Sequence, residues 1–166
     1  MDNIYCCKKS DLQQTLRDYI NYSSVDFNYA ATLTTQNDIK NIESLKKNGQ
    51  RFLRRYNNEL GFRNYKRKVK YDPTQQAPMV AVIEGNGKKG QNGKKYHYHL
   101  ALHKPDNLSD AEFEVIVKKC WRESNDGNVY KSDVRPMYDF GWIEYITKDI
   151  TRNNTDALDI ERTHIY

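Results

Sequence analysis

The clearest pattern along the chain is a pair of short extended segments separated by a turn-rich stretch. The first, 79–84, is an apolar run that ends at Glu84. In the second, 96–102, apolar side chains alternate with His97 and His99, a period of two that is typical of a strand. The Gly- and Asn-rich residues between the segments predict a hairpin with a long tip. In simple register, Glu84 lies opposite His97, and both can point to the same side.

Other parts of the chain show either the helical period or a further alternation. These patterns predict a helix at about 10–19, a strand at 25–35 and a helix from Asn37 as its N-cap to about 60. They further predict a helix that begins after Ser109 and ends at about 121, a strand at 129–134 and a helix at 140–150. Ser109, followed three residues later by Glu112, has the spacing of a capping box and marks where the third helix begins.

This order of elements predicts an α+β protein that forms a single domain over residues 1–166. An antiparallel central sheet of about five strands, with the helices packed on it, accounts for the order. We expect the core of the domain over about 25–150. The N-terminal helical segment 1–22 and the polar tail 151–166 are expected to be peripheral.

Composition narrows the setting in which this domain would work. The net charge is +5 and the pI is near 9.0, which permits a polyanionic partner without requiring one. The 3 cysteines show no zinc-binding spacing, so we expect free thiols in a reducing compartment. No apolar stretch reaches the length of a membrane span, and the N-terminus lacks the shape of a signal peptide. These features favour a cytoplasmic location and no membrane partner.

Candidate nucleic-acid contacts occur in three parts of the chain. Basic residues interleaved with aromatic ones follow the second helix, as a groove for a single strand requires, although a basic run is often only a solvated face. The hairpin tip carries lysines, and the end of the first strand presents hydroxyls that can bond phosphate oxygens. The candidate DNA-binding residues are Thr34, Thr35, Arg54, Arg55, Lys66, Arg67, Lys88 and Lys89.

Glu84, His97 and His99 form a candidate metal site. Residues two apart on a strand point the same way, so both imidazoles can reach one ion, and Glu84 adds a carboxylate from the neighbouring strand. This set suits Mn²⁺, Mg²⁺, Zn²⁺ and other divalent metals, and it leaves coordination positions open for a substrate. Two histidines at this spacing also occur by chance and in metal sites with other chemistry.

Tyr145 and Lys148 are three positions apart in the last predicted helix, so they share a face. A nearby cation or metal favours the phenolate form, which makes Tyr145 a candidate covalent nucleophile. The alternative is that Tyr145 only continues the aromatic packing begun by Trp142. Taken alone, Tyr-x-x-Lys is a weak motif, and it gains weight only beside the metal-ligand set.

In combination, these residues resemble the HUH single-strand endonucleases, in particular the rolling-circle replication initiators of plasmids, small phages and single-stranded DNA viruses. Residues 97–99 match the histidine–hydrophobe–histidine strand, and residues 145–148 match the nucleophile motif. The segment 31–35 is similar to the first motif of the family, and Glu84 stands in the position of the third metal ligand. The resemblance extends over about 27–150, with order and spacing in agreement.

The resemblance implies a ferredoxin-like HUH fold and metal-dependent nicking and joining of single-stranded DNA. It implies that Glu84, His97 and His99 hold a divalent ion, most readily Mn²⁺ or Mg²⁺. Tyr145 would attack the scissile phosphate, form a 5′-phosphotyrosyl link and free a 3′-OH, while Lys148 would orient the phosphate. The implied partners are single-stranded DNA at a replication origin, with or without a hairpin, and a separate helicase and polymerase. The implied location is a bacterial or archaeal cytoplasm, or the compartment in which a virus replicates its DNA.

Some features depart from the family or leave alternatives open. The motif contains one tyrosine, so members with paired tyrosines match less well, and neither Tyr138 nor His103 is assigned a role. No ATP-binding Gly-x-x-x-x-Gly-Lys motif is present, so DNA unwinding would come from elsewhere. A transposase or relaxase with the same chemistry remains an alternative. So does a non-catalytic domain that binds single-stranded nucleic acid, with incidental histidines.

Overall fold

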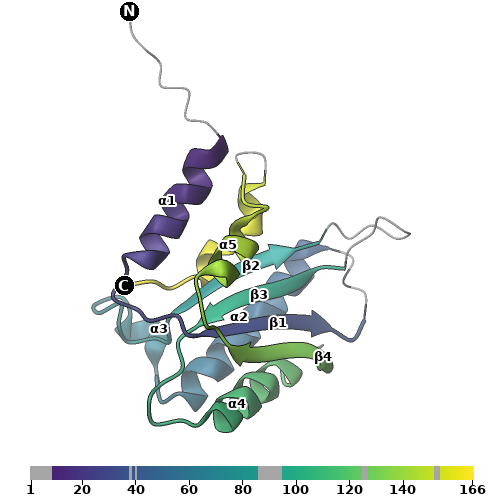
Figure 1. Cartoon of the computed structure of the whole chain (residues 1–166). Helices are drawn as coiled ribbons and strands as arrows, with labels where there is room; N and C mark the ends of the chain where they lie inside the picture. The colour runs from purple at the N-terminus through teal and green to yellow at the C-terminus, as the bar shows by residue number, and fades with distance from the viewer. Residues whose placement is uncertain (1–8, 38, 40, 86–94, 125–126, 152–153) are drawn as a thin grey trace, which may run out of the picture.

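The computed structural model describes all residues of the chain except 1–8, 38, 40, 86–94, 125–126 and 152–153 (Figure 1). Its strands are β1 (Tyr29–Thr35), β2 (Met79–Glu84), β3 (His97–Leu102) and β4 (Gly127–Pro136), which pair antiparallel in the order β2-β3-β1-β4. A further segment adds isolated antiparallel bridges along the outer edge of β2. The predicted α+β class with a central antiparallel sheet is therefore confirmed.

The helices cover both faces of this sheet. They are α1 (Lys9–Asn21), α2 (Ile42–Glu59), α3 (Tyr65–Lys68), α4 (Asp110–Arg122) and α5 (Gly141–Thr147), followed by the short 3-10 helices η1 (Thr155–Ala157) and η2 (Ile160–Arg162). Figure 1 shows α2 and α4 on one side of the sheet and α1 and α5 on the other. In the described part of the chain, no helix combines the length and apolar character needed to span a membrane.

Strand alternation gives the sheet two buried faces. Ala81 and Leu100 belong to the core under α2 and α4, whereas Val80 and Val82 belong to the core under α1 and α5. Burial on both faces explains why β2 is a continuous apolar run rather than an alternating one. At the Glu84 end of β2, the face toward α5 becomes polar, and the candidate site lies there.

The C-terminal segment 154–166 packs against β2 instead of lying peripherally as the sequence led us to expect. Its His164 exchanges backbone hydrogen bonds with Met79 at 2.6 and 3.0 Å. Its Asp159 is buried and accepts a hydrogen bond of 2.6 Å from the Tyr98 hydroxyl. Arg162 donates to Asp159 at 3.0 Å, so a buried ion pair and an edge of the sheet, rather than an apolar stripe, hold this polar segment in place.

The sequence predicted caps for two helices, and the structure confirms one of them. The capping box is confirmed, because Ser109 Oγ accepts from the Glu112 amide while the Glu112 carboxylate accepts from Ser109. The expected cap at Asn37 is wrong: α2 begins at Ile42, and the Asn41 side chain accepts from the Ser44 amide at 2.8 Å. Both positions are asparagine, so residue type alone does not choose between them.

Candidate metal centre and neighbouring tyrosine

The β2–β3 hairpin brings the three candidate ligands together at one end of the sheet. Glu84 pairs with His97 across the strands, as predicted, and His99 lies two residues further along the same face of β3. His99 Nε2 is 2.9 Å from Glu84 Oε2 and 3.1 Å from His97 Nε2. One ligand atom from each residue lies within 4.8 Å of the others, so this group could hold a metal ion.

Each histidine is oriented by a contact through its other ring nitrogen. The Lys95 carbonyl lies 2.8 Å from His97 Nδ1, and because a carbonyl only accepts, Nδ1 carries the proton and Nε2 keeps its lone pair. His99 Nδ1 lies 3.0 Å from the hydroxyl of Thr32, which β1 places opposite His99 in the sheet. Such partners fix the rings of metal-binding histidines, so both Nε2 atoms are held toward one point.

Burial keeps His99 in the form that binds metals. The residue is only 5% exposed, and burial, reinforced by the neighbouring His97, lowers the pKa of His99 to about 4. Its imidazole is therefore neutral at pH 7. Two imidazoles and one carboxylate make a donor set that fits a divalent ion, with the metal's identity open among several.

Tyr145 lies directly against this group. Trp142 anchors α5 to β3, because its indole Nε1 donates to the Leu100 carbonyl at 2.9 Å. The Tyr145 ring stacks on Trp142 and meets the His99 ring edge-on, with both centroid separations equal to 5.4 Å. Tyr145 nevertheless remains 43% exposed. It therefore continues the aromatic packing and is also accessible at the site, so the two interpretations of the sequence are compatible.

Lys148 lies between Tyr145 and the candidate ligands Glu84, His97 and His99, which we call the metal group. Its Nζ lies 3.6 Å from the centroid of the Tyr145 ring and 3.5 Å from Glu84 Oε2. The predicted common face of Tyr145 and Lys148 is thus present on α5. Burial by itself would lower the pKa of Lys148, but the contact with Tyr145 and the Glu84 carboxylate raise it overall. The ammonium ion is a fixed positive charge beside the phenol.

Helix α1 holds the end of α5 from the outside. Arg17 donates through Nε to the Thr147 hydroxyl at 2.8 Å and through its terminal nitrogen to the Glu144 carbonyl at 3.1 Å. Gln13 donates to the Lys148 carbonyl at 2.7 Å. Sequence reasoning missed Arg17, Gln13 and Thr32, because nothing local indicates that α1 packs on α5 or that β1 pairs with β3.

The candidate DNA-binding hydroxyls lie in the fold rather than on an open surface. Thr35 is buried and donates to the Asn37 carbonyl at 2.8 Å. The Thr34 hydroxyl is buried, and no hydrogen-bond partner occurs for it among the described residues. Thr34 shares the face of Thr32 by strand alternation, so it belongs to the side of β1 that faces the metal group.

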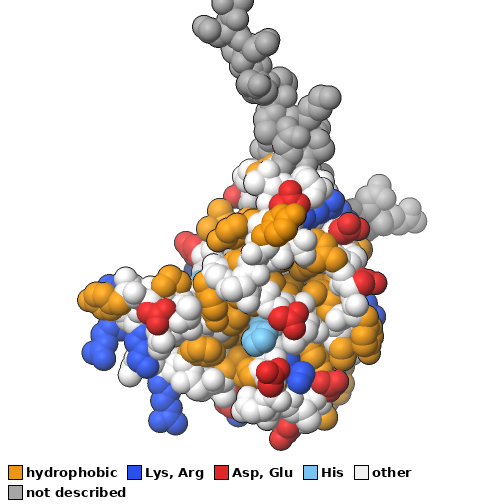
Figure 2. Space-filling view, turned by 60° about the vertical axis from the view of Figure 1, so that its left-hand side comes forward, with side chains coloured by type: hydrophobic (Ala, Val, Ile, Leu, Met, Phe, Trp, Pro, Cys, Tyr) orange, Lys and Arg blue, Asp and Glu red, His pale blue; other side chains and the backbone are white. Residues whose placement is uncertain are grey.

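The basic candidates divide into separate groups. Arg54, Lys66 and Arg67 are exposed on α2 and α3. Arg55 is ion-paired with Glu123, which directly follows α4, with an N–O distance of 3.0 Å. Figure 2 shows exposed Lys and Arg side chains gathered on a projection at the left of the surface. Lys88 and Lys89 lie outside the described residues.

The residues without an assigned role stay away from the metal group. His103 Nδ1 is 2.8 Å from the Asp26 carbonyl, at the other end of β3. Tyr138 is 91% exposed.

The assembled site combines three residues that could hold a metal ion, an accessible phenol and a neighbouring cation. A hard Lewis acid, a nucleophilic oxygen and a positive charge are the groups that displacement at phosphorus requires. No model of a known protein family, no curated protein and no solved structure matches this chain.

Proposed function

We propose that this protein nicks and rejoins single-stranded DNA through a covalent link to Tyr145. The observation that carries the proposal is the edge-on contact between Tyr145 and His99, which places an accessible phenol beside a metal-ligand set. The resemblance of segments 97–99 and 145–148 to the HUH endonucleases supports the same chemistry. Within this chemistry we propose initiation of rolling-circle replication of a plasmid, phage or virus, because the resemblance is to initiators of that type. A transposase or relaxase would use the same chemistry and is the alternative.

The proposed reaction exchanges one phosphodiester for another. The Tyr145 oxygen attacks the scissile phosphorus and loses its proton, while the bond from phosphorus to the 3′ oxygen breaks and that oxygen takes up a proton. The products are a 5′-phosphotyrosyl link and a free 3′-OH, which can prime synthesis. Because the new ester resembles the old one in energy, attack by a 3′-OH reverses the step and joins strands without external energy.

The other residues hold the substrate for this step. Glu84, His97 and His99 would bind a divalent ion, Mn²⁺ or Mg²⁺, which supplies Lewis-acid polarisation of a phosphate oxygen. Lys148 would neutralise charge that develops on the phosphate, because its ammonium ion already stands over the Tyr145 ring. Thr32 and the Lys95 carbonyl keep both imidazoles aimed at the ion.

The test is covalent capture. The full chain, Tyr145→Phe and the control Tyr138→Phe are incubated with Mn²⁺ and a pool of random-sequence single-stranded oligonucleotides, because the nick sequence is not known. We expect the wild type and Tyr138→Phe to form an adduct stable in denaturing gels, and Tyr145→Phe to form none. An oligonucleotide labelled at its 3′ end should label the adduct, whereas a 5′ label should not, since the tyrosine retains the 5′ phosphate.

Two outcomes would contradict the proposal. An equal adduct with Tyr145→Phe would assign the nucleophile to another residue. If all three proteins bound the oligonucleotides and none formed an adduct with any of them, the alternative of a non-catalytic binding domain would be favoured.

A further inference from the structure

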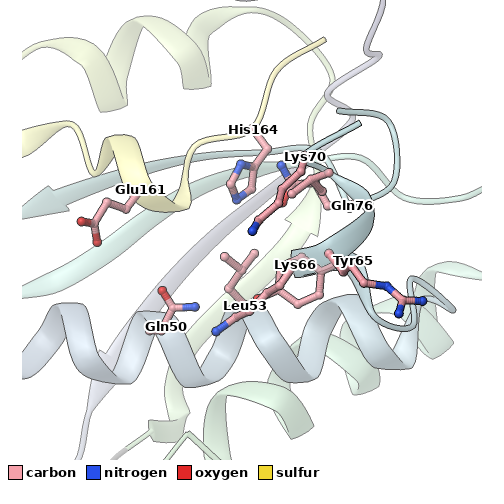
Figure 3. A pocket seen from close by; sticks show the side chains of 10 residues that line it. Gln50, Leu53, Tyr65, Lys66, Lys70, Gln76, Glu161 and His164 are labelled. Atoms are coloured by element: carbon pink, nitrogen blue, oxygen red, sulfur yellow. The ribbon is translucent and has the colours of Figure 1, made fainter. Parts of the chain in front are cut away.

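A second site lies away from the metal group, where α2, α3 and the C-terminal segment meet. The cavity has a volume of about 650 Å³, and its lining includes Gln50, Leu53, Lys66, Lys70, Gln76 and His164 (Figure 3). A volume of this order is within the usual range of small-molecule pockets. His164 pairs with Met79, whereas Glu84 is at the opposite end of β2. The two ends are five positions apart in β2, or about 17 Å along the strand.

The charge of the cavity favours an anion. Lys66, Arg67 and Lys70 line it, and no ion pair occurs for any of these side chains within the described part of the chain. Figure 3 shows the Lys70 side chain ending below His164 and the Lys66 side chain running beside Leu53 toward Gln50. The acidic lining residue, Glu161, accepts from Arg162 at 2.7 Å, which offsets its negative charge.

Two polar side-chain atoms beside this cavity are buried. His164 Nε2 is buried, and no hydrogen bond to it occurs among the described residues. Burial lowers the pKa of His164 to about 4, so the ring is neutral and can donate or accept one hydrogen bond. The hydroxyl of Tyr65, a residue only 6% exposed, is also buried, and the Gln50 side chain lies beside it. Because both atoms are closed off from solvent, a ligand in the cavity would contact the cations and the open lining rather than these atoms.

The apolar part of the lining is suited to a flat ring. Leu53, Tyr65 and Val69 contribute apolar surface, while the two glutamines, Gln50 and Gln76, offer amides that can pair with the edge of a base. A bare phosphate would use the cations and leave this surface empty. A nucleoside would use the surface and leave the cations without a counter-charge.

We propose that this cavity binds one nucleotide, with the phosphate on Lys66, Arg67 and Lys70 and the base between the apolar lining and the amides. The nucleotide is either free or part of a strand, since both present the same chemistry. The site does not depend on the nicking chemistry proposed for Tyr145.

Binding is measured by nuclear magnetic resonance titration of the full-length chain in EDTA, so that no metal at Glu84, His97 and His99 contributes. The probes are the four deoxynucleoside monophosphates, inorganic phosphate and deoxyadenosine. We expect at least one monophosphate to shift the signals of Gln76 and His164 and to bind at least tenfold more tightly than phosphate or the nucleoside. Equal affinity for phosphate, or shifts elsewhere only, would overturn the proposal.

Charge-matched variants separate a specific site from general attraction. Lys66→Gln with Lys70→Gln removes two charges from the lining, whereas Arg63→Gln with Lys68→Gln removes two exposed charges of the same region that do not line the cavity. We expect at least a tenfold loss of affinity with the first pair and less than a twofold loss with the second. An equal loss with both pairs would overturn the proposal.

A competing strand identifies the source of the nucleotide. If the cavity serves DNA, a single-stranded hexanucleotide displaces the bound monophosphate; if it serves a free nucleotide, the monophosphate stays bound. Either result supports nucleotide recognition, and absence of binding by both probes overturns it. A failure here would leave the Tyr145 capture result intact, because that experiment measures a different group.

Discussion

The phenol ring of Tyr145 meets the imidazole of His99 edge-on, with ring centroids 5.4 Å apart and an interplanar angle of 82°. The contact is set by packing, because Trp142 stacks under Tyr145 and is itself bonded to the backbone of β3. In the proposed reaction, an oxygen held in this way would need little reorientation before attack, which would lower the entropic cost of the step. The predictions below separate the parts of this arrangement.

Lys148→Met should slow covalent adduct formation by about 100-fold, the effect typical of losing a group that stabilises developing charge. Binding of Mn²⁺ should be unchanged or tighter, because the ammonium ion no longer competes for Glu84, 3.5 Å away. The measurement is the single-turnover rate of adduct formation in saturating Mn²⁺. Lys131→Met, an exposed position on β4, is the control and should match the wild type. A normal rate with Lys148→Met would remove Lys148 from the proposed mechanism.

If the metal group binds Mn²⁺, the ion should stabilise the folded protein. A site that binds only the folded state raises the free energy of unfolding by about 2.7 kcal/mol when the ion is present at 100 times its Kd. We therefore expect Mn²⁺ to raise the midpoint of thermal unfolding of the wild type and of His103→Ala, but not of His97→Ala. An equal rise with His97→Ala would place the bound ion elsewhere.

Tyr98, the residue between the two histidines, should matter for stability rather than for metal binding. Its hydroxyl donates to the buried Asp159 at 2.6 Å, and hydrogen bonds to charged groups contribute about 1.5–3 kcal/mol. Tyr98→Phe should lower the free energy of unfolding in urea by about this amount while keeping the Mn²⁺ response. Tyr130→Phe, at a position 95% exposed, should change little. Equal stabilities of the two variants would show that the contact with the C-terminal segment is not stabilising.

Local patterns were sufficient for the hairpin and its ligands. A period of two determines which side chains share a face, and a hairpin joins neighbouring strands, so Glu84, His97 and His99 could be grouped from sequence alone. The common face of Tyr145 and Lys148 follows from the helical period in the same way.

Contacts between distant segments could not be predicted in this way. Thr32 reaches His99 only because β1 pairs with β3, and the sequence does not specify the order of strands in the sheet. The C-terminal segment has too few apolar residues to indicate burial, yet the Asp159–Arg162 ion pair is buried within it. The cavity lined by Lys66, Arg67 and Lys70 likewise forms only where α2, α3 and this segment meet.

A substitution of Arg17 should loosen the packing of the proposed nucleophile, Tyr145, without touching the candidate metal ligands. Its guanidinium bonds the Thr147 hydroxyl and the Glu144 carbonyl, so it fixes the last turn of α5, next to Tyr145. Arg17→Met keeps much of the aliphatic stem but removes these bonds. We expect about a tenfold slower adduct formation, because small losses of alignment reduce the fraction of productive geometry. The rise in the thermal midpoint caused by Mn²⁺ should be retained, since Arg17 contacts neither β2 nor β3 in these bonds.

The same substitution elsewhere tests whether the effect is local. Arg135→Met removes an exposed guanidinium from β4 that pairs with Asp133, and it should leave the adduct rate unchanged. If Arg17→Met abolished both the stabilisation by Mn²⁺ and the formation of the adduct, the Arg17 hydrogen bonds would be a general requirement of folding. If it changed neither, the Arg17 hydrogen bonds would not be needed to position α5. Only slower adduct formation with intact Mn²⁺ binding agrees with the proposal that the Arg17 hydrogen bonds position Tyr145.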